Sequence, residues 1–219
     1  ERGADNAKDQ SYVVHMLDQA ALGRTLFPVG DIDKTEVRRL ASEMGLRTAS
    51  KPDSQDVCFI TSTGGRQTFL GDRISFRQGR VVDTSGSALG KVEAVEMITI
   101  GQRRGIGLPG GGPKRYVVDV DVPNGTVVVG DDDDLFRTTM VVERATWIEA
   151  PVDGAVLVQC SAHGVPQPAT IANDIAGKVA GGSVRVTWNE PQRRIAPGQS
   201  VVFYDLADKC VLGGGTATR

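Results

Sequence analysis

The sequence is poor in the residues that build metal centres and crosslinks. Its 219 residues include two histidines, His15 and His163, and three cysteines, Cys58, Cys160 and Cys210. These residues are too scattered for a zinc site, and an odd number of separated cysteines indicates neither a disulfide framework nor a CxxC motif. Reduced thiols are typical of cytosolic proteins, so we expect a cytoplasmic location and no bound metal.

Long apolar runs and an excess of positive charge are also missing. No stretch of about 20 apolar residues occurs and no signal peptide opens the chain, so we expect no membrane segment. The formal net charge is -2. Because nucleic-acid-binding domains are usually basic, a role of that kind would need a local patch. The first residue is Glu1 rather than Met, and we expect the chain to be a piece of a longer protein.

Cys58 follows a polar, acidic stretch and precedes two apolar residues, in KPDSQDVCFI over residues 51–60. A thiol there could be reached by solvent and by a second molecule, which favours sulfur chemistry. The alternative is a small buried hydrophobe, as free cysteines often are. These ten residues leave both interpretations open. Cys160 and Cys210 fall in expected strands, and we expect both in a β-barrel core.

Apolar residues at helical spacing predict two helices near the start of the chain. Asp9 or Ser11 can cap the first, whose apolar face lies within residues 13–22. The second covers residues 34–44, with Gly45 as its terminator. These helices have no sheet of their own, so we expect them to pack on protein that lies upstream.

The remainder of the chain, from about residue 76, has the pattern of short strands and turns. Pro123-Asn124-Gly125 between two β-branched runs is a strong hairpin signal. Asp131 to Asp134 lack the spacing of a calcium loop, which favours a solvated turn. Strands that recur about every ten residues after residue 138 predict a small closed barrel. The expected strands are 79–83, 116–120, 126–130, 140–142, 155–158, 169–171, 183–188, 200–204 and 210–212.

Residues 105–110 match the GxGxxG pattern of dinucleotide sites. Pro109 and the glycines that follow cannot open a helix well, and no βαβ unit surrounds them. The sequence also lacks a GxxxxGK[ST] phosphate loop. A nucleotide site of either kind is therefore not expected.

The stretch from Met97 to Arg115 is locally basic. It holds Arg103, Arg104 and Lys114 besides Arg115, and no acidic residue. Many glycines surround these cations, so the backbone could come close to a ligand. The composition suits phosphate contacts with RNA, and the alternative is a mobile basic loop on a solvated surface.

Several motifs occur together in a fixed order. They are KDQSY at 8–12, FPVG at 27–30, KPDSQDVCFI at 51–60, TIGQRRGIG at 99–107, PGQS at 197–200 and LGGG at 212–215. In this combination the chain resembles the bacterial tRNA-specific 2-thiouridylases over essentially its whole length. The resemblance implies a mainly β protein with an N-terminal α-helical segment. Residues 1–61 would end an α/β ATP-pyrophosphatase-like catalytic domain, 62–137 would form a central β-rich domain, and 138–219 an elongation-factor-like β-barrel.

The resemblance also implies a reaction, the replacement by sulfur of the C2 oxygen of the wobble uridine of tRNA. ATP adenylates that oxygen, a cysteine persulfide delivers sulfur to C2, and a second, upstream cysteine closes a disulfide. Cys58 matches the persulfide-carrying cysteine, a nucleophile loaded in advance with sulfur. The target base must leave its stack. Expected partners are tRNA and a sulfur-donor protein, such as a cysteine desulfurase or a relay protein.

The resemblance places several residues at tRNA contacts. Lys8, Asp9 and Gln10 match a segment near the target base, and Gln199 matches a contact on the barrel; with Arg103 and Arg104 they make up the expected tRNA surface. Ser161 and Ala162 stand where the family often has an Arg-Tyr pair, so that contact could pass to His163.

The ATP-binding SGGxDS loop and the second catalytic cysteine of the family do not occur in this sequence. We therefore expect this piece alone neither to bind ATP well nor to thiolate tRNA. One alternative is a non-catalytic tRNA-binding module in which Cys58 is structural. A tRNA methyltransferase, a label the family has sometimes carried, ranks last because nothing resembles a site for S-adenosylmethionine.

Overall fold

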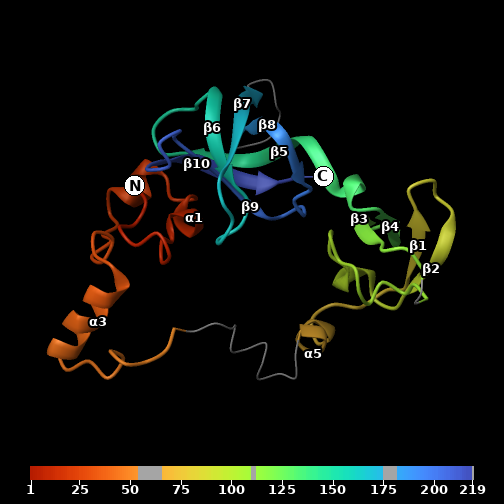
Figure 1. Cartoon of the computed structure of the whole chain (residues 1–219), viewed down its shortest axis with the longest axis horizontal. Coiled ribbons are helices and arrows are strands. Elements are labelled where there is room, and N and C mark those ends of the chain that lie inside the picture. Colours follow the sequence, from red (N-terminus) through yellow and green to blue (C-terminus); the bar gives the residue numbers. More distant parts are fainter. Residues whose placement is uncertain (54–65, 110–111, 175–181, 219) are drawn as a thin grey trace. The chain divides into compact units, whose positions relative to one another are not determined.

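The computed structural model describes residues 1–53, 66–109, 112–174 and 182–218 (Figure 1). These residues form two compact units. The barrel unit combines Glu1–Lys51 with Arg137–Arg219, and the central unit is Pro52–Phe136. Cys58 and most of its motif lie outside the described residues. No helix in the described ranges is long and apolar enough to cross a membrane.

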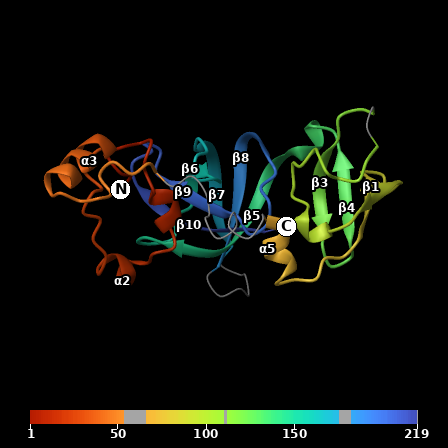
Figure 2. The same ribbon diagram turned by 90° about the horizontal axis from the view of Figure 1, so that it is seen from below.

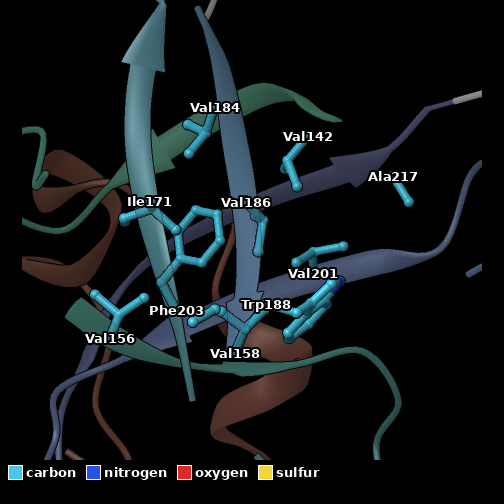
Figure 3. Packing of buried hydrophobic residues seen from close by; sticks show 11 residues of the cluster. Val142, Val156, Val158, Ile171, Val184, Val186, Trp188, Val201, Phe203 and Ala217 are labelled. Atoms are coloured by element: carbon cyan, nitrogen blue, oxygen red, sulfur yellow. The ribbon is translucent and has the colours of Figure 1, made fainter. Parts of the chain in front are cut away.

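The closed barrel that the strand spacing predicts is confirmed. Its strands follow one another in the order β10-β5-β8-β7-β6-β9. They are β5 (Phe136–Trp147), β6 (Gly154–Gln159), β7 (Gln167–Asp174), β8 (Ser183–Arg193), β9 (Ser200–Tyr204) and β10 (Val211–Ala217). Side chains along a strand point alternately into the barrel and out of it. In β8, Val184, Val186 and Trp188 are buried in the core and the residues between them are exposed (Figure 3).

The LGGG motif is explained by close packing of β10 between its two neighbours. A Cβ atom on Gly214 would lie 2.6 Å from the ring of His15 and 2.6 Å from the carbonyl oxygen of Val201. His15 is buried, and its Nδ1 lies 2.8 Å from the carbonyl oxygen of Tyr12. The motif therefore lets the first helix of the chain approach the barrel.

The N-terminal segment contains α1 (Ser11–Val14), α2 (Gln19–Leu22) and α3 (Lys34–Glu43). The first expected helix is split in two, because the carboxylate of Asp18 accepts a hydrogen bond from the backbone of Ala21 and starts a new helix. The second is confirmed: Asp33 caps α3, and Gly45 follows it with a φ of +67°. Tyr12 packs with Val202 and Tyr204 of the barrel, so the expectation of packing only on upstream protein is wrong for α1.

The central unit is built on a four-stranded sheet of order β2-β1-β4-β3. Its strands are β1 (Gly79–Asp83), β2 (Ala88–Val92), β3 (Tyr116–Asp121) and β4 (Thr126–Gly130), with β3 and β4 forming the predicted hairpin (Figure 2). The helical turns α5 (Arg66–Gly71), η1 (Val95–Met97) and η2 (Asp133–Leu135) complete it. Valines of β1, β3 and β4 and Ile106 fill its core.

Candidate functional site

Arg2 is the centre of a largely buried network in the barrel unit. Its guanidinium donates hydrogen bonds to Asp9 at 2.7 Å, to Asp208 at 2.8 Å and to Gln159 at 3.0 Å. The same group lies 3.8 Å from the centre of the Tyr204 ring, a cation–π contact. We call these five residues the Arg2 network. It joins the start of the chain to β6, to β9 and to the turn that follows β9.

Asp9, one of the expected tRNA contacts, is almost fully enclosed by this network. Its side chain is 6% exposed, and its carboxylate accepts hydrogen bonds from the backbone of Gly3 and Ser11, from the Ser11 hydroxyl and from Arg2. Burial alone would raise the pKa of Asp9, but these hydrogen bonds outweigh it and hold that pKa below its usual value. The neighbours Lys8 and Gln10 are exposed.

The network also reaches the other expected contacts of the barrel unit. The amide of Gln159 donates to the carbonyl oxygens of Ser161 at 2.8 Å and Ala162 at 3.4 Å. The hydroxyl of Tyr12 donates to the carbonyl oxygen of Ser200 at 2.7 Å, directly after the exposed Gln199. The structure therefore ties segments 8–10 and 161–162 to one hydrogen-bonded framework, and Tyr12, which lies outside the five network residues, separately holds the backbone next to Gln199.

A cleft of about 510 Å³ in the central unit contains the remaining expected contacts, Arg103 and Arg104. Both arginines and Lys114 are exposed, and within the described ranges no carboxylate pairs with any of the three. The walls are formed by Leu89, by residues 103–109 and by residues 112–115.

Hydrogen bonds and glycines fix the shape of the loop that carries these arginines. The side chain of Gln102 accepts a hydrogen bond from the backbone of Thr99 at 3.0 Å and donates to the carbonyl oxygen of Arg104 at 2.8 Å. The backbone of Gly101 donates to Val117 of β3 at 2.8 Å. Gly105 and Gly107 have positive φ angles, +68° and +69°. These contacts hold the backbone on both sides of Arg103, while the side chains of Arg103 and Arg104 stay exposed.

Three family models match the chain in succession. They describe a tRNA methyl transferase HUP domain over residues 1–62, a tRNA methyl transferase PRC-barrel domain over 67–131 and an aminomethyltransferase beta-barrel domain over 137–217. The chain is 42% identical over 217 residues to a protein named tRNA-specific 2-thiouridylase MnmA from Acaryochloris marina, covering 98% of this chain and 60% of that protein. It is 43% identical over 224 residues to the protein of the same name from Acidothermus cellulolyticus, covering 100% and 59%.

The chain belongs to the tRNA-specific 2-thiouridylase family. It spans about 60% of the length of the curated relatives that it matches. The mainly β architecture with a closed C-terminal barrel agrees with the fold that the family resemblance implies.

The two described cysteines of this 2-thiouridylase-family chain differ in setting. Cys160 directly follows β6 and packs against the barrel core, and burial raises the pKa of its thiol to about 12. Cys210 lies in the turn before β10, where its backbone donates to Asp205 at 2.8 Å, so the expectation of a core strand position is wrong for it. Within the described part of the chain, no group of three or more histidine, cysteine or acidic side chains could hold a metal ion.

The residues that the sequence did not single out are Arg2, Gln159 and Asp208. Gln159 directly follows the apolar run Ala-Val-Leu-Val of β6 and is buried. Because buried amides are hydrogen-bonded, a glutamine at the end of such an apolar run is a sequence signal for a hydrogen-bonded group inside the protein. Arg2 and Asp208 stand 206 positions apart, and no local pattern connects them.

Replacement of Arg2 by Ala is expected to lower the free energy of unfolding of the barrel unit by about 3 kcal/mol. The substitution leaves the buried carboxylate of Asp9 without its cation and removes the anchor of Gln159. Denaturant unfolding of the 219-residue chain measures the loss. Because the pKa of folded Asp9 is lowered, its stabilising contribution is present at neutral pH and disappears as the pH falls below about 4, so the effect should shrink there.

Arg39→Ala is the matched control for this substitution. Arg39 pairs with Glu36 and Glu43, but all three lie on the surface of α3, where ion pairs contribute little. No measurable change in unfolding is expected. Equal losses for Arg2→Ala and Arg39→Ala would show that the network does not hold the segment to the barrel.

Proposed function

We propose that this chain acts within a longer enzyme that thiolates the wobble uridine of tRNA at C2, a tRNA-uridine 2-sulfurtransferase of the cytoplasm. The observation that carries the proposal is the Arg2 network, which joins segment 8–10 to segment 161–162 in one framework, together with the hydrogen bond by which Tyr12 holds Ser200 next to Gln199. Each segment bears residues at which the family resemblance implies tRNA contacts.

Within that framework Asp9 acts as a positioning residue. Its carboxylate is already committed to Gly3, Ser11 and Arg2, so it holds Lys8 and Gln10 in place while their exposed side chains meet the RNA. The loop 161–163 is held through its backbone oxygens, which leaves the exposed His163 free to replace the Arg-Tyr pair that relatives often carry.

In the proposed reaction, Cys58 carries the sulfur as a persulfide that a desulfurase or relay protein loads. The terminal sulfur attacks C2 of the uridine and displaces the activated O2 as AMP. The thiolate of a second cysteine then attacks the sulfur atom of Cys58, which breaks the persulfide S–S bond, leaves the transferred sulfur on C2 and joins the two cysteines in a disulfide. ATP supplies the activation of O2. The described residues offer no phosphate loop for ATP, and the sequence has no SGGxDS segment, so no residue of this chain is assigned to that activation.

Nucleoside analysis of a treated tRNA tests the proposal. A full-length protein that contains this chain is incubated with ATP, a persulfide donor and an unmodified tRNA with uridine at the wobble position, and the digested RNA is examined by mass spectrometry. We expect 2-thiouridine at that position and none in a transcript with cytidine there. Tight tRNA binding without any 2-thiouridine would favour the alternative, a non-catalytic tRNA-binding module.

A further inference from the structure

The cleft of the central unit holds three cationic side chains that form no ion pair within the described residues. Arg103, Arg104 and Lys114 line one hollow, and none of them pairs with a carboxylate in the described ranges. Arg115 differs, because it lies near Asp83; after hydrogen bonds from Ser85 and Ser87, it helps to lower the pKa of that carboxylate. Like charges held together in one hollow raise the local concentration of anions and favour an anionic ligand.

Arg103 and Arg104 stand on a loop whose backbone is held by contacts within the chain. Gly107 has a φ of +69°, and a methyl group on it would overlap the carbonyl oxygen of Lys91 in β2. Gln102 fixes the backbone on both sides of Arg103. Such a loop loses little conformational entropy when a ligand binds, so more of the contact energy appears as affinity.

Apolar side chains form the rest of the cleft. Leu89 is 36% exposed, Leu108 is half-buried and Ile106 is buried, and all three line the hollow. A phosphate group gains no favourable contact energy from apolar walls, whereas the flat face of a nucleobase gains contact energy when it packs against them. The volume of about 510 Å³ falls in the usual range for small-ligand sites.

We propose that this cleft binds a single unstacked nucleotide of an RNA strand. Its phosphates are held by Arg103, Arg104 and Lys114, and its base lies against Leu89 and Leu108. The inference rests on the proposed function in that the strand belongs to the tRNA substrate. Duplex RNA fits less well, because its stacked bases cannot reach the apolar walls and only the cations would be used.

Binding of short RNAs to the 219-residue chain tests this inference by fluorescence anisotropy. The probes are an eight-nucleotide uridine RNA, the same strand with abasic sites in place of the bases, and a duplex of equal phosphate number. We expect the uridine strand to bind best. Arg103→Ala with Arg104→Ala should flatten the salt dependence of log K by about 1.4, because two phosphate contacts are lost. Leu89→Ser should weaken the uridine strand by about tenfold and leave the abasic strand unchanged.

Controls separate this result from general effects of charge and folding. Arg24→Ala with Arg47→Ala removes the same charge from exposed sites of the barrel unit and should leave the uridine strand bound as before. Thermal unfolding checks that each variant folds. Equal affinity for the uridine and abasic strands would overturn the inference, without bearing on whether the full-length protein makes 2-thiouridine. A base-dependent loss in Leu89→Ser supports it even where the thiolation assay gives no product.

Discussion

Cys58→Ser in the full-length protein is expected to abolish the formation of 2-thiouridine, with a loss of at least about 1,000-fold, as is usual when a nucleophile is removed. The serine hydroxyl cannot hold a sulfur atom as a persulfide, so no sulfur can be passed to C2. Binding of tRNA should remain within about twofold, because a change of one atom is too small to alter a broad RNA interface. Mass spectrometry of the digested tRNA measures product, and anisotropy measures binding.

The chain supplies its own controls for this substitution. Cys160 packs against the barrel core, and its pKa of about 12 keeps the thiol protonated and unreactive at neutral pH. Cys210 lies in the turn before β10. Cys160→Ser and Cys210→Ser should therefore leave the yield of 2-thiouridine close to that of the unchanged protein. If Cys58→Ser thiolates tRNA at the same rate as these two variants, Cys58 is not the sulfur carrier.

The barrel could be predicted from the sequence because its strands follow local rules. In β8 the alternation of Val184, Val186 and Trp188 with polar residues marks one face of a half-buried strand. β2 escaped the same reasoning, since Ala88-Leu-Gly-Lys-Val has one β-branched residue and three weak strand formers, Ala88, Gly90 and Lys91. The first helix was predicted too long because Asp18 fits either the polar face of a helix or the cap that it forms.

The Arg2 network lay beyond local reasoning. Its five members stand at positions 2, 9, 159, 204 and 208 of the sequence. A buried ion pair between such distant positions produces no periodic pattern within any one segment. The motif around Asp9 pointed to RNA, and the structure shows that the carboxylate in that motif is turned to internal bonds. The sequence motif alone could not show that this carboxylate is used inside the protein.

Gly107→Ala is expected to destabilise the central unit by more than about 4 kcal/mol, a range reached only by severe substitutions. A left-handed backbone costs a non-glycine residue about 1–2 kcal/mol. The larger part arises because the new methyl group would overlap the carbonyl oxygen of Lys91, which is backbone and cannot swing aside as a side chain could. The loop must then leave β2, which uncovers the buried Ile106 next to it.

Two further glycines separate these contributions. Gly101 has a φ of +81° and open space around its Cβ position, so Gly101→Ala should cost only the backbone term of about 1–2 kcal/mol. Gly112 has open space and no positive φ, and Gly112→Ala should change stability by less than about 0.5 kcal/mol. Hydrogen exchange resolves the effect by region: amides of β1, β3 and β4 should lose protection in Gly107→Ala, while those of the barrel keep theirs.

Because the loop also carries Arg103 and Arg104, the same variant should lose binding of the uridine strand. Retained binding together with lost protection would mean that the cations do not depend on this loop for their placement.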